Sequence, residues 1–287
     1  MNRRVFTSHG TAGILFAVAH TVWSKEAVFP FLALGACSNL SNAAAIKAAG
    51  GEYVEENVKR FLVPDKPESE WAKKRKEALS CPLPTPSCNS FLPGSLKSTG
   101  PDANHEAVLN YAETAFKRAS QVGVGIIVFG SSGSRRLPEG FPVEKANEQF
   151  VALLKKMGPL AQTHGVTVVV EPLRRQECNF INTVVEGASI VEKTNHPHVR
   201  LLFDIYHMLQ NGEDPNDLRT VGHLLAHGHI AEKEKRSAPG VAGDDFRPFF
   251  AALKHIGYQG RISIEGRWKN EDLPNAYKVI REQAREA

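Results

Sequence analysis

The segment GVTVVVEP, residues 165–172, decides the fold prediction, because a run of branched apolar residues ends there in a single carboxylate, Glu171. The same pattern returns in RLLFD at residues 200–204 and in RISIEG at residues 261–266. Apolar runs without alternation are typical of strands that are buried on both faces of a parallel sheet. We therefore predict that each segment is a parallel strand with a carboxylate at its carboxyl end.

Outward from this segment, stretches of strand and helix character alternate along the chain. The predicted strands lie at residues 31–36, 52–56, 85–91, 125–130, 166–172, 200–204, 224–230 and 261–266. The third of these is expected to be irregular because it contains prolines. The predicted helices lie at residues 39–49, 68–79, 105–122, 143–163, 182–194, 215–224, 244–256 and 271–285. This order favours an α/β fold, the (β/α)8 TIM barrel. The competing architecture is a doubly wound sheet, but the turn after the first strand, GACSNLSN, lacks the GxGxxG fingerprint.

The composition is that of an ordinary globular protein, with 42% hydrophobic and 23% charged residues among 287. Residues 29–287 are long enough for one barrel domain. The formal net charge is +4 and the basic residues are scattered, so we expect no nucleic-acid partner. The four cysteines form no CxxC pair and are interpreted as buried free thiols, with a disulfide between Cys81 and Cys88 as the alternative for an exported protein.

The amino terminus differs from the rest of the chain. Arg3 and Arg4 precede an uncharged apolar run from Thr11 to Val22. This pattern predicts a twin-arginine-like export signal over residues 1–28 and hence a periplasmic location. A poorly packed helix on a cytoplasmic protein is the alternative. The run is too short for stable insertion into a membrane.

Four polar residues occupy the ends of the last four predicted strands: Glu171, Asp204, His229 and Glu265. In a barrel of parallel strands the carboxyl ends meet at one mouth, so these side chains are expected to converge. Three carboxylates and one imidazole form an oxygen-rich ligand set that suits a divalent ion such as Mn²⁺ or Mg²⁺. For Glu171 alone, a structural ion pair with a neighbouring arginine is an equally good interpretation.

Two further histidines lie near these strand ends. His207 follows Asp204 by three residues, where we expect a loop to curl back over the site. His227 and His229 differ by two positions on one strand and so point to the same side. We expect His227 to be a layer residue inside the barrel or a partner that supports a metal ligand.

Four motifs carry a resemblance to a known family: EPLRRQE, DIYHM, HGHIAE followed by RSAPG, and SIEG. They resemble the xylose isomerase-like barrels of sugar isomerases and epimerases, among which ketose 3-epimerases and hydroxypyruvate isomerase are most similar. The resemblance implies one bound divalent ion, with Mn²⁺ expected and Mg²⁺, Co²⁺ or Zn²⁺ as alternatives. It also implies that substrate oxygens are bound by Glu177, His207 and Arg236. In two departures, Arg174 stands where such proteins often have Asn, and the loop that carries Arg236 is one residue longer.

These features predict a metal-dependent isomerase or epimerase that acts on a keto sugar by proton transfer through an enediolate. Glu171 and Glu265 are the predicted acid–base pair. The main alternative is a lyase that opens 3-keto-glycosides, followed by an abasic-site endonuclease-like hydrolase and a sugar-binding module. The expected partner is a small carbohydrate, and the sequence is compatible with a homo-oligomer.

Overall fold

The computed structural model describes residues 33–287, which form a closed barrel of eight parallel strands. The strands are β1 (Leu34–Cys37), β2 (Tyr53–Asn57), β3 (Ser87–Asn89), β4 (Ile126–Phe129), β5 (Thr167–Val170), β6 (Val199–Asp204), β7 (Leu225–Ile230) and β8 (Arg261–Ile264). They follow one another in chain order around the barrel, and β1 pairs in parallel with both β2 and β8. The predicted (β/α)8 barrel is therefore confirmed, and the doubly wound sheet is wrong.

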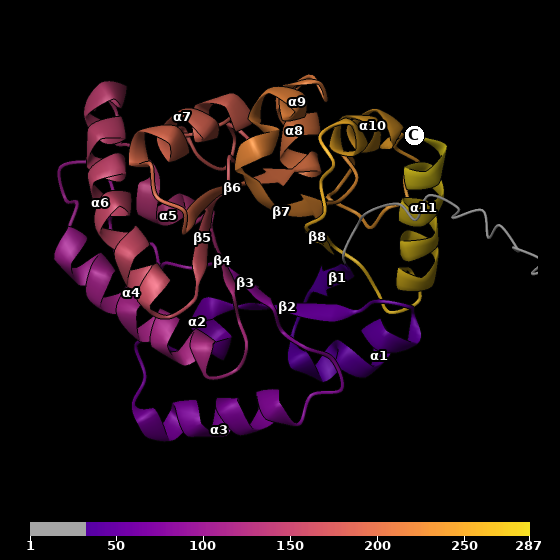
Figure 1. Ribbon diagram of the computed structural model, residues 1–287, viewed down its shortest axis with the longest axis horizontal. Coiled ribbons are helices and arrows are strands. Elements are labelled where there is room, and N and C mark those ends of the chain that lie inside the picture. The colour runs from indigo at the N-terminus through magenta and orange to yellow at the C-terminus, as the bar shows by residue number, and fades with distance from the viewer. Residues whose placement is uncertain (1–32) are drawn as a thin grey trace, which may run out of the picture.

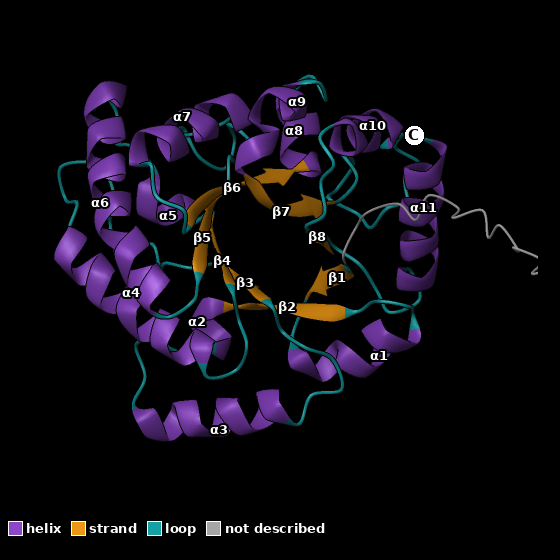
Figure 2. Ribbon diagram, in the orientation of Figure 1, coloured by secondary structure: helices purple, strands orange, loops and turns teal. Residues whose placement is uncertain are grey.

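Helices surround the strands on the outside of the barrel (Figures 1 and 2). The helices that match predicted ones are α1 (Ala43–Ala48), α3 (Glu68–Leu79), α4 (His105–Ser120), α6 (Val143–Thr163), α7 (Val184–Thr194), α9 (Asp217–Val221), α10 (Arg247–His255) and α11 (Leu273–Glu286). Side-chain caps fix where some of them begin: Asn104 accepts from the Ala107 amide at α4, and Thr183 accepts from the Glu186 amide at α7. These caps satisfy amides that the first helical turn leaves without intrahelical partners.

Several short elements differ from the predicted ones. The first predicted helix opens with a 3-10 turn, η1 (Leu40–Asn42), and the ninth helix is followed by another, η2 (Gly222–Leu224). Three further helices stand where the sequence indicated turns or loops: α2 (Val58–Phe61), α5 (Ser132–Arg135) and α8 (Ile205–Asn211). The third strand shrinks to three residues, since the flanking prolines cannot donate to a ladder.

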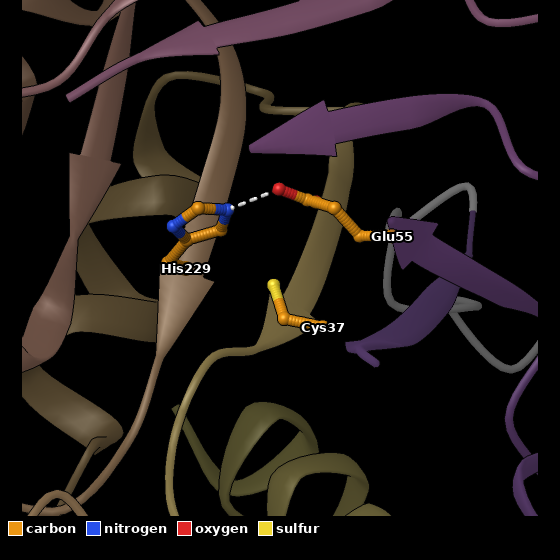
Figure 3. A group of neighbouring side chains, drawn as sticks. All are labelled: Cys37, Glu55 and His229. Carbon is orange, nitrogen blue, oxygen red and sulfur yellow. Dashed lines mark hydrogen bonds and ion pairs between the residues drawn. The ribbon is translucent and has the colours of Figure 1, made fainter. Parts of the chain in front are cut away.

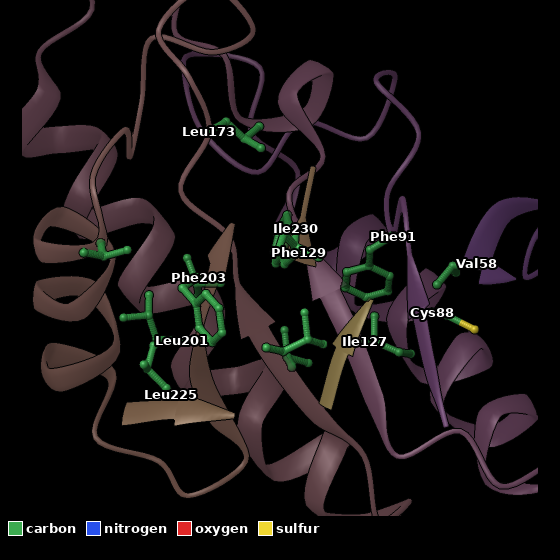
Figure 4. Packing of buried hydrophobic residues seen from close by; sticks show 14 of the residues in the cluster. Val58, Cys88, Phe91, Ile127, Phe129, Leu173, Leu201, Phe203, Leu225 and Ile230 are labelled. Carbon is green, nitrogen blue, oxygen red and sulfur yellow. The ribbon is translucent and has the colours of Figure 1, made fainter. Parts of the chain in front are cut away.

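The main core lies between the strands and the surrounding helices. Phe129 of β4 makes edge contacts with Phe91 and with Phe150 of α6, at ring-centroid distances of 5.4 and 5.0 Å. Figure 4 shows Phe91 and Phe129 within this layer. A separate cluster is formed by Val128, Val169 and Leu202, on three neighbouring strands. These apolar layers hold the strands rigidly, so that their carboxyl ends can position a site.

The described residues also bear on the cysteine and membrane predictions. All four cysteines are free, so the alternative of a Cys81–Cys88 disulfide is wrong. Cys88 and Cys178 are buried, whereas Cys37 and Cys81 are partly exposed. Within residues 33–287, no helix combines the length and the apolar character that a bilayer crossing requires. The predicted export signal at residues 1–28 lies outside the described residues.

Candidate active site

The structure brings together the four residues that the sequence placed at strand ends. Glu171 follows β5, Asp204 ends β6, His229 lies in β7 and Glu265 follows β8. One potential ligand atom from each of the four lies within 4.8 Å of the corresponding atoms of the others. The convergence predicted for one half of the barrel mouth is therefore present in the fold.

His229 lies between the two glutamates. Its Nδ1 is 3.3 Å from Glu171 Oε1 and 3.0 Å from Glu265 Oε2. The carboxylates come from β5 and β8, which are not neighbours in the barrel, so they approach this nitrogen from different strands. Glu171 contacts His229, while Arg174 pairs with Glu177 at 2.7 Å. These contacts favour the metal-site interpretation of Glu171 over an ion pair with Arg174.

The two carboxylate oxygens of Asp204 have different partners. Its Oδ1 accepts a hydrogen bond from the Tyr206 amide at 2.8 Å and so caps α8. Its Oδ2 faces Arg236, whose Nη2 is 3.1 Å away. The helix cap fixes the carboxylate, which leaves the second oxygen aimed into the site.

The predicted substrate residues Glu177, His207 and Arg236 line one cleft, together with Glu171 and Glu265. His207 lies in α8, so the expectation that a loop carries it is wrong. That helix forms because Asp204 caps its first turn. Nδ1 of His207 accepts from the Arg174 amide at 3.2 Å, so the ring proton is on Nε2, 3.4 Å from Asp204 Oδ2. His207 therefore presents a donor next to a candidate metal ligand.

Arg236 reaches the site from the loop after β7. Its Nη2 donates to Glu265 Oε2 at 2.5 Å, and its guanidinium lies 4.7 Å from the centre of the Tyr206 ring. Arg236 has a φ of 55°, a left-handed conformation that is uncommon for a residue with a side chain. Gly266 lets this loop approach closely, because a Cβ at that position would lie 2.5 Å from the Arg236 carbonyl oxygen. Although this loop is one residue longer, it still places at the cleft the arginine that the family resemblance implied.

The two glutamates have different electrostatic environments. Burial, together with the nearby Glu265 carboxylate, raises the pKa of Glu171 above its ordinary value. Burial acts in the same direction on Glu265, but His229 and Arg236 outweigh it and hold the pKa of Glu265 well below its usual range. A pair of carboxyl groups whose pKa values are pushed apart is a common arrangement for acid–base catalysis.

The sequence interpretation missed one residue that binds Glu265 and one that leaves room for Glu171. Asn89, at the end of β3, donates from Nδ2 to Glu265 Oε1 at 2.7 Å. Gly130 follows β4, and a Cβ there would lie only 2.0 Å from Glu171 Oε2. The strand-end position of each residue was visible in the sequence, but nothing there showed which glutamate it would meet.

Glu55 on β2 is the largest omission. This buried carboxylate accepts from His229 Nε2 at 2.9 Å and from His227 Nε2 at 2.6 Å. Figure 3 shows Glu55 and His229 joined by this bond, with the Cys37 sulfur close to both. The available signal was a pair of acids, Glu55 and Glu56, inside a predicted strand. His227 contacts a partner of His229, which agrees with its predicted supporting role.

The four strand-end residues fit a divalent cation. They offer three carboxylates and an imidazole from four different strands or strand ends, which is a donor set suited to such ions. Burial alone would lower the pKa of His229, but Glu265 and Glu55 outweigh it and hold this pKa well above its usual value. Concentrated negative charge of this kind favours a cation at the point where the side chains meet.

Comparison with known proteins supports the same family. The chain is 34% identical over 126 residues to the L-ribulose 3-epimerase of Methylomonas sp. (strain DH-1), covering 43% of this chain and 44% of that protein. It is 34% identical over 128 residues to the 3-dehydro-D-guloside 4-epimerase of Escherichia coli (strain K12), covering 44% of this chain and 48% of that protein. The chain thus spans about half the length of these curated relatives.

A solved structure described as the IOLI protein with a binding zinc atom shares the fold, with a TM-score of 0.69 and 17% identity. That likeness covers 88% of this chain and 98% of the other. The family model described as xylose isomerase-like TIM barrel matches residues 43–285. Because this match takes in nearly all of the barrel, including every strand from β2 onward, the chain belongs to the xylose isomerase-like TIM barrel family.

Proposed function

We propose that this protein is a metal-dependent sugar epimerase or isomerase that moves a proton at the carbon next to a ketose carbonyl. The observation that carries the proposal is the placement of Glu171 and Glu265 on two non-adjacent strands, both within 3.3 Å of His229 Nδ1. Both glutamates also line the same cleft. Two carboxyl groups that approach one point from different strands can remove a proton on one face of a substrate and return it on the other.

The metal would be held by the four residues that converge at the barrel mouth: Glu171, Asp204, His229 and Glu265. When bound, a divalent ion polarises a substrate carbonyl and acidifies the adjacent C–H bond. The zinc atom named for the IOLI protein, which has the same fold, supports a divalent ion here. We keep Mn²⁺ as the expected ion because the donors are mainly oxygens.

The remaining cleft residues would position the sugar. Glu177 accepts hydrogen bonds, whereas His207 Nε2 and Arg236 donate them, so together they match the hydroxyl and carbonyl oxygens of a carbohydrate. Arg236 already contacts Glu265 and Asp204, and its positive charge would stabilise negative charge that develops on a substrate oxygen nearby. Proton return to the same carbon gives epimerisation, and return to its neighbour gives isomerisation.

A second candidate substrate class is the 3-keto-glycosides. The relative from Escherichia coli is named for a 3-dehydro-D-guloside, which combines a keto group with a glycosidic bond. The same proton abstraction next to the carbonyl would lead to epimerisation or to elimination of the glycosidic group. The export signal predicted at residues 1–28 favours such substrates, and we propose a periplasmic location on that ground.

A substrate screen tests the proposal. The protein is loaded with Mn²⁺ and incubated with free ketoses and with 3-keto-glycosides, and products are scored as epimer, isomer or cleaved sugar. We expect metal-dependent conversion within at least one of the two classes. The Glu171→Gln variant is the matched control, and conversion that persists unchanged in this variant would contradict the proposed chemistry.

A further inference from the structure

We propose that Glu55 is a positioning residue that fixes the proton of His229 on Nε2, so that Nδ1 is presented to the metal. This inference rests on the metal-dependent function proposed above, and it adds a residue to that site. Glu55 lies on β2, on the far side of the imidazole ring from the candidate metal ligands. The two nitrogens of one ring thus connect two different carboxylate groups.

The contacts of His229 define the two sides of its ring. Nδ1 faces Glu171 Oε1 and Glu265 Oε2 at 3.3 and 3.0 Å, where the metal ligands converge. Nε2 faces Glu55 Oε1 at 2.9 Å. In Figure 3 the bond to Glu55 leaves one ring nitrogen, and the other nitrogen points away from Glu55. A neutral imidazole has one protonated and one unprotonated nitrogen, and only the unprotonated nitrogen can bind a metal.

The surroundings of Glu55 leave it only the role of an acceptor. Its Oε2 accepts from Ser87 Oγ at 2.8 Å, from Ser263 Oγ at 2.6 Å and from His227 Nε2 at 2.6 Å. With His229 Nε2 on Oε1, four donors from β3, β7 and β8 surround one buried carboxylate. Three of these donors meet Oε2 and one meets Oε1, and an ionised carboxylate can only accept hydrogen bonds. His229 must therefore be the donor in its bond to Glu55.

This arrangement has a known chemical consequence in metal sites. A ligating histidine whose other ring nitrogen donates to a carboxylate has its tautomer and its ring orientation fixed, and it becomes more basic. Loss of such a partner typically weakens metal binding about 10- to 100-fold. If Glu55 only packed inside the barrel and bonded its neighbours there, its substitution would change stability without a specific effect on metal affinity.

Glu56 provides a matched control on the same strand. It is also a buried glutamate, but it accepts from the Leu40 amide at 3.0 Å and pairs with Arg60 at 2.8 Å. It belongs to the opposite face of β2, because successive strand residues point to opposite sides. The variants Glu55→Gln and Glu56→Gln therefore remove one buried charge each, and only the first affects His229.

The first test measures the dissociation constant for Mn²⁺ by titration calorimetry in the wild-type protein and in both variants. We expect Glu55→Gln to bind Mn²⁺ about 10- to 100-fold more weakly than Glu56→Gln. Equal affinities, within threefold, would overturn the inference. Wild-type protein that binds no Mn²⁺ would contradict the metal-dependent function and this inference together, whereas normal wild-type binding with equal variants contradicts only the role of Glu55.

The second test needs no Glu55 variant and so remains decisive if Glu55→Gln does not fold. Histidine side chains are labelled with ¹⁵N, and long-range ¹H–¹⁵N spectra are recorded on the protein loaded with Zn²⁺. The signals of His229 are assigned from their loss in His229→Asn. We expect a protonated Nε2 and a metal-bound Nδ1. A metal-bound Nε2, or a proton on Nδ1, would overturn the inference.

Discussion

The Gly130→Ala substitution should impair catalysis while leaving the fold intact. A Cβ at this position would lie 2.0 Å from Glu171 Oε2 and 3.2 Å from Glu171 Cδ. Because ordinary contacts to a carbon atom begin at about 3.5 Å, the carboxylate must retreat by more than about 1 Å. The displaced atom is the end of a flexible side chain, so the backbone of β4 need not move.

The size of the effect follows from this displacement. A misplacement of about 1 Å in a catalytic group can lower the rate about 100-fold. The free energy of unfolding should change by no more than about 1 kcal/mol, because replacing Gly by Ala also restricts the unfolded chain. We therefore expect a loss of about 100-fold in kcat for Gly130→Ala, with little change in stability.

Gly125 offers a matched control at the other end of β4, since a Cβ there meets nothing within 4 Å. The assay compares kcat on the substrate found in the screen, and urea unfolding, for Gly125→Ala and Gly130→Ala. If the two variants had kcat values within threefold of each other, the argument that Gly130 makes room for a catalytic Glu171 would be refuted.

Three further predictions concern the acid–base pair, the metal and the pH dependence of stability. Glu171→Gln and Glu265→Gln should each lower kcat by about 10²- to 10⁴-fold with circular dichroism unchanged, and near-normal turnover in either would remove that residue from the pair. Chelation should abolish turnover and added Mn²⁺ should restore it; full activity of the metal-free protein would exclude a metal-dependent reaction. Burial raises the pKa of Glu213 to about 7. The neutral carboxyl group therefore contributes to the stability of the folded protein fully below about pH 4.5, and this contribution is lost as the pH rises through 7. The glutamine side chain of Glu213→Gln is neutral at every pH. The free energy of unfolding of this variant minus that of the wild type, measured with urea, should therefore rise by about 1–2 kcal/mol between pH 5 and pH 9. A difference that stays constant over this range would contradict the prediction.

The sequence predicted the barrel because its strands are marked by a property of each segment alone. VTVVV and RLLF are apolar on both faces, and their carboxyl ends carry acids, so strand type and direction follow from local pattern. The same local pattern predicts that Glu171, Asp204, His229 and Glu265 lie at one mouth of the barrel. The structure then brought their ligand atoms within 4.8 Å of one another.

The residues that the sequence did not reveal depend on contacts between distant segments. Glu55 meets His229 across 174 positions, and Asn89 meets Glu265 across 176. No periodicity within β2 or β3 reports such a partner. The helix α8 was missed for a related reason, because Asp204 was interpreted only as a metal ligand although its other oxygen caps this helix.

Solvent-hydrogen exchange tests the central claim most directly. The metal-loaded protein is incubated in D₂O with the ketose that it converts, and the product is analysed by NMR and mass spectrometry. Proton transfer by Glu171 and Glu265 predicts one deuterium at the carbon next to the carbonyl, and its absence in both Gln variants. Conversion without incorporation of solvent deuterium would contradict proton transfer by this pair of glutamates.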